Sequence, residues 1–262
     1  MRYTAKQVYD KLVNDDKILT LKGQIKFYLG DVSIIVKQKD VVGNIIQEWI
    51  QGWLEKNEIE YSPSVNTQMP PDFFLNPDNK QEGLLEVKAF NSKANPGFDI
   101  ADFKMYEREI IDKPYMLNVD SLIFAYDMSD DGVVTIKNVW LKKVWEITRP
   151  MTNWPLNLQI KNGIVHKIRP GVWYGNSSIH FFNSTADFLS AVEETVFKNK
   201  DTHNDFPNWR DNFTLNYKKQ YGIEIDFPRW GHIKANYESF DFKLTKEEID
   251  VIDRIPPNDI GM

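Results

Sequence analysis

The sequence predicts an α/β fold in which a central mixed β-sheet is flanked by helices. Apolar runs of strand length, bounded by turn residues, alternate with segments whose apolar positions have helical spacing. Of the 262 residues, 42% are hydrophobic, which suffices for a substantial core. The chain shows neither an internal repeat nor a low-complexity segment, so we expect one large domain built around one sheet.

The first part of the chain is predicted to contain two helices and a pair of strands. Thr4–Val13 has the pattern of a short helix. Ile18–Leu21 and Gly23–Val36 alternate like paired strands, and Gly30-Asp31 marks a turn. In the next segment the apolar positions 42, 45, 46, 49, 50, 53 and 54 follow helical spacing. We therefore expect a long helix there, with Asp40 as its N-cap.

The rest of the chain continues the alternation of strands and helices. Strands are expected at Ile59–Pro63, Asp72–Leu75, Gly83–Phe90, Ser121–Asp127 and Val133–Trp145. Helices are expected at Phe98–Asp112 and at Thr185–Lys198, the latter capped by Ser184 or Thr185. From Lys200 onward the chain is polar and aromatic, so we expect irregular structure up to a short helix near Thr245–Ile255.

Composition excludes several classes of site. The absence of cysteine excludes disulfide scaffolds, thiolate metal sites and cysteine nucleophiles. The four histidines lack the spacing of a zinc site or an HNH-type nuclease. No apolar run approaches the length of a membrane span, and the N-terminal residues lack the apolar region of a signal peptide. We expect a soluble protein in a bacterial-type cytoplasm, with no membrane partner.

Charge is distributed unevenly along this acidic chain. Its net charge is −6, yet the segment from Ile136 to Tyr174 carries a net charge of +6. The charged residues of this segment are Lys137, Lys142, Lys143, Glu146, Arg149, Lys161, Lys167 and Arg169. Two interpretations stay open: a positive surface that meets a phosphate backbone, or a sheet edge that lysines protect from association.

Two acids and a lysine stand on neighbouring apolar runs. Asp72 begins Asp72–Leu75, and Glu86 and Lys88 lie two residues apart on the next expected strand, so both point to the same face. Thirteen residues that include the turn formers Asn76-Pro77-Asp78-Asn79 separate Asp72 from Glu86. A strand–turn–strand hairpin is the simplest geometry, and it brings Asp72 toward the other two.

Charges on apolar strands require compensation, because an unpaired buried charge is costly. A divalent metal held by Asp72 and Glu86, with the backbone carbonyl of Val87, supplies it, and Mg²⁺ prefers such oxygen ligands. Lys88 would orient or deprotonate a water, or stabilise charge on a phosphate. This arrangement suggests phosphodiester hydrolysis. The alternative is structural, because Glu-x-Lys on a strand is often an exposed pair.

Pro71-Asp72 … Glu86-Val87-Lys88 resembles the motif of the PD-(D/E)XK nuclease superfamily, and the chain is most similar to type II restriction endonucleases of the EcoRV-like branch. The order of flanking elements extends the resemblance to about residues 20–195. A helix with an acid, Glu48, precedes the motif, and an apolar strand follows it. The resemblance implies a restriction-endonuclease-like core at about 18–145, and a DNA-recognition and C-terminal subdomain at about 146–262.

The resemblance implies a Mg²⁺-dependent homodimer that cuts both strands of a short double-stranded DNA site, alongside a cognate DNA methyltransferase acting on the same site. Asp72 and Glu86 are then the metal-binding carboxylates, Lys88 the catalytic lysine, and Glu48 an acid that assists metal or water placement. Glu48 could instead be a solvated residue on the polar side of its helix. Glu in place of the more usual Asp at position 86 puts only fine metal geometry in doubt.

Two polar segments are candidates for DNA contacts, because base reading needs side chains that both donate and accept hydrogen bonds. The first precedes the catalytic strand and the second resembles a recognition loop. The residues concerned are Asn66 and Gln68 in the first, and Arg169, Tyr174, Asn176, Ser177 and Ser178 in the second. Each could instead form a turn. Trp209-Arg210 and Arg229–His232 could contact phosphates, although packing is the favoured interpretation.

The leading hypothesis is therefore a site-specific type II restriction endonuclease. A structure-selective nuclease of the same superfamily, acting in repair or junction resolution, is the alternative among enzymes. A DNA-binding or assembly module without catalytic activity is the alternative outside enzymes. The intact set of Asp72, Glu86 and Lys88 argues against the last of these.

Overall fold

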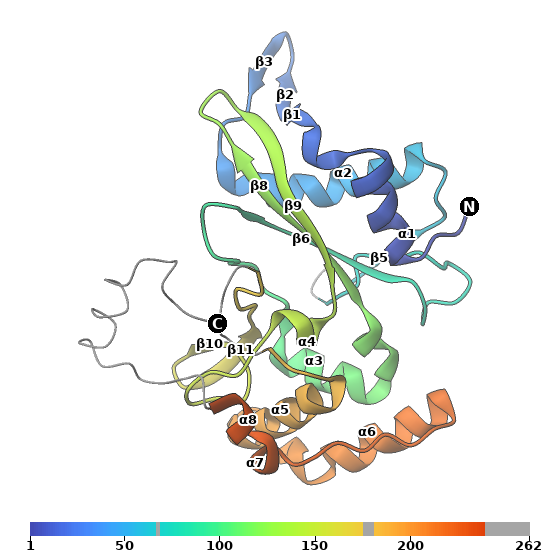
Figure 1. The fold of residues 1–262 in the computed structure, drawn as a ribbon, viewed down its shortest axis with the longest axis vertical. Coiled ribbons are helices and arrows are strands. Elements are labelled where there is room, and N and C mark those ends of the chain that lie inside the picture. Colours follow the sequence, from blue (N-terminus) through green and yellow to red (C-terminus); the bar gives the residue numbers. More distant parts are fainter. Residues whose placement is uncertain (67–68, 175–180, 239–262) are drawn as a thin grey trace, which may run out of the picture.

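A six-stranded mixed sheet runs through the middle of the molecule (Figure 1). The computed structural model describes residues 1–66, 69–174 and 181–238. The strands lie in the order β1 (Lys22–Gln24), β9 (Val133–Lys142), β8 (Asp120–Met128), β6 (Leu84–Asn91), β5 (Phe73–Phe74) and β4 (Ser62–Pro63). Only β6 and β8 pair in parallel, and the other neighbours are antiparallel. This mixed sheet confirms the predicted fold class.

Two smaller β-structures accompany the main sheet. A three-stranded sheet contains β10 (Leu158–Lys161), β11 (Ile164–Ile168) and β7 (Ala101–Asp102). A separate two-stranded hairpin contains β2 (Lys26–Leu29) and β3 (Val32–Ile35), with the predicted turn between them. In Figure 1 this hairpin projects beyond the end of the main sheet.

Helices cover both faces of the main sheet, as Figure 1 shows. The helices are α1 (Ala5–Asp10), α2 (Val42–Lys56), α3 (Phe103–Asp112), α4 (Val144–Ile147), α5 (Thr185–Lys198), α6 (Phe206–Tyr221), α7 (Trp230–Ile233) and α8 (Ala235–Glu238). α1 and α2 pack on one face, whereas α3, α5 and α6 belong to the other. No helix within the described ranges combines the length and the apolar composition needed to cross a membrane.

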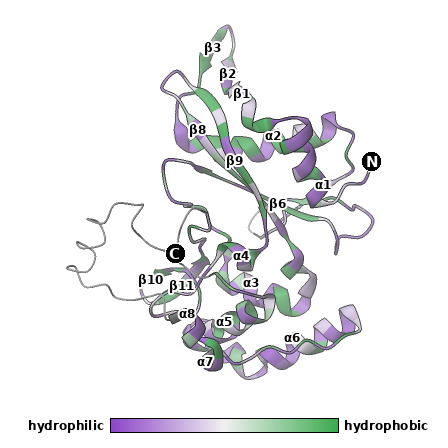
Figure 2. Cartoon of the chain, in the orientation of Figure 1, coloured by the Kyte–Doolittle hydropathy of each residue, from purple (hydrophilic) through white to green (hydrophobic). Residues whose placement is uncertain are grey.

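The alternation of side chains along β8 divides the interior into two hydrophobic clusters. Leu122 and Phe124 pack in the cluster of α1 and α2, whereas Ile123 and Ala125 pack in the cluster of α3, α5 and α6. Successive side chains of a strand point to opposite faces, so a strand covered on both sides must be apolar throughout. The middle strands are accordingly rich in hydrophobic residues (Figure 2).

The predicted cap of α5 is confirmed and that of α2 is wrong. The hydroxyl of Ser184 accepts a hydrogen bond from the backbone N–H of Asp187 at 3.2 Å. At α2 the residue before the helix is Val41, because a short 3₁₀ turn at Lys39–Val41 leads directly into it. Asp40 lies within that turn, so it does not cap the helix.

The expectation of irregular structure after Lys200 is also wrong within the described part of the chain. α6 is a helix of 16 residues, with Pro207 in its first turn. It buries only Trp209 and Phe213, so its sequence shows little of the amphipathic pattern by which helices are recognised. Tertiary packing of these two aromatic rings against the rest of their cluster stabilises it. The expected helix near Thr245–Ile255 lies outside the described residues.

A buried acid in α3 makes stability depend on pH. The Glu107 side chain is inaccessible to solvent, and neither of its carboxylate oxygens has a hydrogen-bond partner among the described residues. Arg108 Nε lies 3.4 Å from Glu107 Oε1, but this guanidinium donates its hydrogen bonds to Asp205. Burial, followed by the charge of Asp205, raises the pKa of Glu107 to about 8.

We expect Glu107→Gln to remove a pH dependence of stability. The folded protein holds the Glu107 proton up to about pH 8, whereas the ordinary pKa of a free glutamate is 4.5. The stabilisation is therefore complete below pH 4.5 and lost as the pH rises through about 8. Glutamine mimics the protonated acid, so the variant should match the parent at low pH and exceed it at pH 9 by on the order of a few kcal/mol. Urea unfolding across pH measures this, and parallel curves for both proteins would contradict it.

Candidate active site

The β5–β6 hairpin places Asp72 beside Glu86. β5 pairs antiparallel with β6 in the register Phe73 to Leu85, so the residue before β5 lies opposite the residue after Leu85. The Asp72 Oδ2 atom accepts a hydrogen bond from the backbone N–H of Val87 at 2.8 Å, which fixes the carboxylate against β6. This confirms the predicted strand–turn–strand geometry.

Glu86 and Lys88 form an ion pair on one face of β6. Lys88 Nζ lies 2.7 Å from Glu86 Oε1. Glu86 is only 5% exposed, because β6 is a middle strand with helices on both sides. Leu85 precedes Glu86, and Val87 lies between Glu86 and Lys88. Both side chains pack instead in the hydrophobic cluster that contains α2. The predicted shared face of Glu86 and Lys88 is thus confirmed. Glu86 is buried and Lys88 is partly buried, so this is not an exposed surface pair.

Burial perturbs the protonation of all three side chains. Desolvation, followed by the charge of nearby Asp72, raises the pKa of Glu86 to about 7, although Lys88 acts in the opposite direction. Desolvation also raises the pKa of Asp72. For Lys88, desolvation alone would lower the pKa, but the charge and hydrogen bond of Glu86 outweigh it and raise the pKa overall. The ammonium of Lys88 therefore stays charged at neutral pH.

The carboxylates have the chemistry of a site for a hard divalent cation. Glu86 Oε2 is buried and has no hydrogen-bond partner among the described residues. The raised pKa values of Asp72 and Glu86 show that their negative charges are under-compensated, and a cation would relieve this. In the described ranges, no three or more His, Cys, Asp or Glu side chains are grouped so that they could hold a metal ion together. Any further ligands would therefore be backbone, water or phosphate oxygens, which suit Mg²⁺.

Helix α2 contributes Gln47 to this cluster, not the predicted Glu48. The Gln47 Nε2 atom donates a 2.7 Å hydrogen bond to Asp72 Oδ1. A Cβ on Gly43, one turn earlier, would lie 3.9 Å from the carbonyl oxygen of Ala89, so this side of α2 approaches β6 closely. Glu48 is exposed, and no contact within the described chain joins it to the cluster. The sequence signal for Gln47 is its spacing from Gly43, because residues four apart lie on the same side of a helix.

Arg169 and Tyr174 lie toward the same face as Lys88. Arg169 follows β11 and its guanidinium pairs with Asp99, whose charge in turn helps to raise the pKa of Lys88. The ring of Tyr174 stacks on Trp140 with centroids 5.0 Å apart, and on Phe90, which follows Lys88 by two positions on β6. The structure thus brings these two candidates for DNA contacts near the cluster of Asp72, Glu86 and Lys88.

Among the remaining DNA-contact candidates, only Asn66, Trp209, Arg210 and Arg229–His232 lie within the described residues. Asn66 is exposed in the connection between β4 and β5. Gln68, Asn176, Ser177 and Ser178 lie outside the described residues. In α6, Trp209 is inaccessible to solvent, and the Arg210 guanidinium binds Glu193 and the carbonyl of Phe227. This confirms the packing interpretation for both.

The positive segment from Ile136 to Tyr174 is partly neutralised in space. The acids that pair with its basic residues come from other elements or the same turn. The pairs are Lys142 with Glu146, Lys143 with Asp120, Lys167 with Asp102, and Arg169 with Asp99. Its excess charge is therefore smaller than the sequence indicates.

Comparison with known proteins assigns the chain to a family. The profile of the NgoBV restriction endonuclease family matches residues 2–237. The chain is 60% identical over 240 residues to the type II restriction enzyme NlaIV of Neisseria lactamica, spanning 91% of this chain and 99% of that protein. It is 59% identical over 165 residues to the type II restriction enzyme NgoBV of Neisseria gonorrhoeae, spanning 62% of this chain and 91% of that one.

A solved structure agrees with the sequence comparisons. The NlaIV restriction endonuclease superposes with a TM-score of 0.88 at 60% identity, over 90% of this chain and 97% of the other. The chain belongs to the NgoBV family of restriction endonucleases.

Proposed function

We propose that this restriction endonuclease hydrolyses both strands of a short site in double-stranded DNA, with Mg²⁺ as cofactor. The observation that carries the proposal is the cluster of Asp72, Glu86 and Lys88, with Glu86 buried, which the β5–β6 hairpin assembles. We also propose membership in the PD-(D/E)XK superfamily and its EcoRV-like branch, on the basis of this motif.

Each residue of the cluster has a distinct role in the proposed reaction. When bound, Mg²⁺ neutralises charge on the scissile phosphate and makes a water more acidic. Asp72 and Glu86 hold the cation, and the N–H of Val87 fixes the Asp72 carboxylate. Lys88, which pairs with Glu86 on the same face of β6, would stabilise developing negative charge on the phosphate.

The surroundings of the cluster supply contacts to DNA in this proposal. Arg169 and Tyr174 stand next to the catalytic face, which supports their role at the phosphate backbone or in a groove. We extend the same role to Asn66 and Gln68 in one segment and to Asn176, Ser177 and Ser178 in the other. Residues 146–262 then form the recognition and C-terminal part, and residues 18–145 the catalytic core.

Cleavage of both strands requires two active sites, so we propose that the enzyme acts as a homodimer. We also propose that it acts in the bacterial cytoplasm. A cognate methyltransferase that modifies the same site would protect the host DNA. The requirement arises because each chain offers one cluster of this kind in its described residues, whereas the two strands of a duplex run in opposite directions. A second copy related by a two-fold axis meets the second strand in an equivalent orientation.

The decisive experiment is incubation of unmethylated plasmid or phage DNA with the protein in Mg²⁺ and, separately, in EDTA. Discrete fragments that form only with Mg²⁺ are expected, and sequencing of their ends gives the site and the position of the cuts. Absence of cleavage on every DNA tested would refute the proposal. Fragments of random length would instead indicate a nuclease without site specificity.

Two adjacent substitutions in α2 separate the roles of Gln47 and Glu48. We expect Gln47→Ala to lower the cleavage rate by about 10- to 100-fold, the usual effect of removing a residue that orients a metal ligand. The reason is that Gln47 holds Asp72 Oδ1. Glu48→Ala should have a smaller effect, because Glu48 is exposed on the same helix.

Single-turnover cleavage at saturating Mg²⁺ and at limiting Mg²⁺ measures the difference between these variants. The loss in Gln47→Ala should be larger at limiting Mg²⁺ if the residue acts through metal placement. A greater loss in Glu48→Ala than in Gln47→Ala would instead restore the assignment that the sequence suggested for Glu48.

A further inference from the structure

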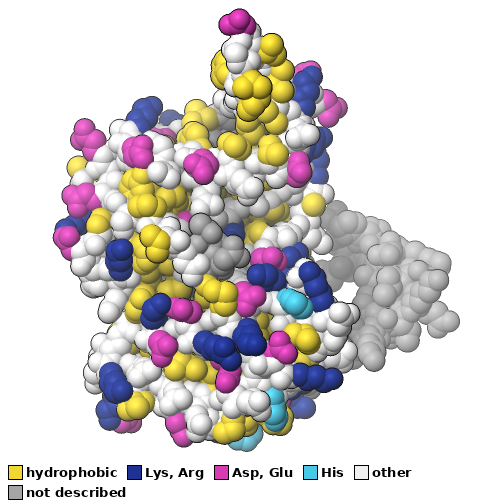
Figure 3. All heavy atoms as spheres, turned by 180° about the vertical axis from the view of Figure 1, so that it is seen from behind, with side chains coloured by type: hydrophobic (Ala, Val, Ile, Leu, Met, Phe, Trp, Pro, Cys, Tyr) yellow, Lys and Arg dark blue, Asp and Glu magenta, His cyan; other side chains and the backbone are white. Residues whose placement is uncertain are grey.

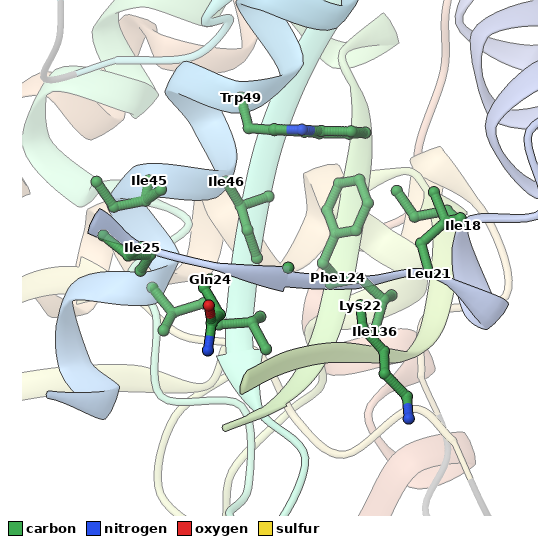
Figure 4. Close-up of a pocket in the computed structure, with 13 residues that line it drawn as sticks. Ile18, Leu21, Lys22, Gln24, Ile25, Ile45, Ile46, Trp49, Phe124 and Ile136 are labelled. Carbon is green, nitrogen blue, oxygen red and sulfur yellow. The ribbon is translucent and has the colours of Figure 1, made fainter. Parts of the chain in front are cut away.

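Two cavities on opposite faces of the main sheet differ in the side chains that line them. The larger, of about 210 Å³, lies beside α2, and apolar side chains such as Ile45, Ile46 and Trp49 form its wall (Figure 4). The smaller, of about 20 Å³, lies on the face that α3 covers. Glu86 and Tyr106 both line this second cavity, so it brings polar groups together inside a hydrophobic cluster.

The alternation of side chains along β6 and β8 directs polar residues to the smaller cavity. Glu86 and Lys88 lie on the same face of β6 as Leu84 and Phe90, which pack in the cluster of α3. In the parallel pairing of β6 with β8, the partner of Glu86 is Ser121. Ser121 therefore lies beside Glu86 on this face, and both line the cavity together with Lys88.

Glu86 and Tyr106 each bury a polar atom that has no hydrogen-bond partner within the described residues. Tyr106 is 2% exposed, and the atom concerned is its hydroxyl oxygen. In Glu86 the Oε1 atom pairs with Lys88, and the Oε2 atom is the one without a partner. Figure 3 shows other Asp and Glu side chains intermingled with Lys and Arg at the surface, where bulk water solvates them. Burial of a polar atom without a hydrogen bond is costly, so two such atoms at one cavity indicate a further group between them.

The size and the lining of the cavity fit one water molecule. A buried water needs a space of at least about 10–15 Å³ and two to four polar partners. The cavity has about 20 Å³, and its polar lining consists of Glu86, Lys88, Tyr106 and Ser121. A tyrosine hydroxyl can donate to a water, and a carboxylate oxygen can accept from it, so one water satisfies both atoms. An anion would be repelled by Glu86, and an organic molecule would not fit.

We propose that this cavity holds a structural water that joins the Tyr106 hydroxyl to the Glu86 carboxylate, which makes Tyr106 a positioning residue for the metal site. The Tyr106 hydroxyl donates to the water, and the water donates to Glu86 Oε2. A carboxylate oxygen has two lone pairs, so Oε2 can accept this hydrogen bond and still bind a cation. Phe188 holds the Tyr106 ring edge-on, with centroids 6.2 Å apart. The inference rests on the proposed function in one respect, because the cation at Asp72 and Glu86 belongs to that proposal.

The water would give Glu86 the same support that Asp72 already has. Asp72 Oδ2 accepts a hydrogen bond from the N–H of Val87 at 2.8 Å, and Asp72 Oδ1 accepts one from Gln47 at 2.7 Å. Lys88 Nζ lies 2.7 Å from Glu86 Oε1, so of these four oxygens only Glu86 Oε2 lacks a partner within the described chain. With the water in place, both oxygens of each carboxylate are held in a fixed orientation.

Tyr106→Phe tests the link, because it removes the hydroxyl and leaves the ring. Calorimetric titration of the full chain with Mg²⁺, without DNA, should show a dissociation constant raised by about 10-fold or more, the usual effect of removing a partner of a ligating carboxylate. In EDTA the variant should melt about 2–4 °C below the parent, because the water and Glu86 lose a hydrogen bond. A hydroxyl without a partner would give the opposite result, since its removal would relieve an unsatisfied buried group and raise the melting temperature.

Tyr126→Phe is the matched control for this variant. Tyr126 is 5% exposed and packs on the opposite face of the sheet, where its hydroxyl donates a 2.8 Å hydrogen bond to the carbonyl of Lys39. Its loss should also lower the melting temperature in EDTA, but it should leave the affinity for Mg²⁺ unchanged. Equal Mg²⁺ affinities of Tyr106→Phe and the parent would overturn the positioning role, even if the melting temperature of Tyr106→Phe falls.

A crystal structure of the metal-free parent protein tests the water itself. Electron density for one water within about 2.5–3.0 Å of both Tyr106 Oη and Glu86 Oε2 is expected. A dry cavity, or a water that bonds to Ser121 and not to Tyr106, would overturn the proposal. Failure of the proposed function gives a different result: a parent that has this water but binds no Mg²⁺ would refute the cation site and with it the role of Tyr106 toward the cation. Mg²⁺-dependent cleavage by a protein with a dry cavity would refute the water link alone.

Discussion

Asp72→Asn is expected to lower the cleavage rate by about 10³-fold or more and to raise the stability of the metal-free protein. If Asp72 binds the metal as proposed, its loss removes several kcal/mol of transition-state stabilisation, and about 1.4 kcal/mol corresponds to a factor of ten in rate. The stability gain arises because the negative charge of Asp72 destabilises the ionised form of Glu86. Burial and this neighbouring carboxylate raise the pKa of Glu86 to about 7. Asparagine removes the repulsion.

The hydrogen bonds of position 72 can survive this substitution. The asparagine oxygen can still accept from the N–H of Val87, and its amide can donate to Gln47 once the Gln47 amide turns its oxygen inward. We therefore expect a gain on the order of 1 kcal/mol, or about 2–4 °C in melting temperature for a chain of this size. Thermal melting in EDTA measures it.

Mg²⁺ provides the internal control for Asp72→Asn. Adding the cation should stabilise the parent protein and leave the variant nearly unchanged, because only the parent has both carboxylates to bind it. Full cleavage activity in the variant, or an equal Mg²⁺-induced stabilisation of both proteins, would show that Asp72 is not a metal ligand. A variant destabilised in EDTA would show that its carboxylate is mainly structural.

Lys88→Met should reduce the cleavage rate by about 10²- to 10³-fold while DNA binding persists, which is the usual effect of removing one stabilising group at a developing charge. Methionine retains much of the apolar stem of lysine, so packing on β6 should change little. Single-turnover cleavage, together with fluorescence anisotropy of labelled duplex DNA without Mg²⁺, measures the two properties separately.

Lys93→Met is the matched control for this variant. Lys93 lies just beyond the end of β6, its side chain is 68% exposed, and it pairs with Asp127 rather than with the catalytic carboxylates. It should cleave DNA at nearly the parent rate. Equal losses in the two variants would mean that Lys88 contributes through general charge rather than through its place beside Glu86.

The sequence by itself determined the catalytic strand and its neighbours. Alternation along a strand places Glu86 and Lys88 on one face whatever surrounds them, and the turn residues between Asp72 and Glu86 fold the chain back locally. The hairpin with its turn at Gly30-Asp31 and the cap of α5 by Ser184 were predicted for the same reason, because neighbours in the chain specify them.

Only the tertiary structure decided which distant side chains meet this strand. Gln47 reaches Asp72, and Glu48 does not, because α2 buries the side that carries Ile46 and Ile50 and leaves Glu48 exposed. Helix α6 shows a weak pattern in its sequence because only two of its aromatic rings are buried, in a cluster whose members range from Met69 to Tyr237. Likewise, the charge of Arg169 is balanced by Asp99, which is 70 residues earlier. Local patterning encodes the motif, whereas packing between distant segments selects its partners.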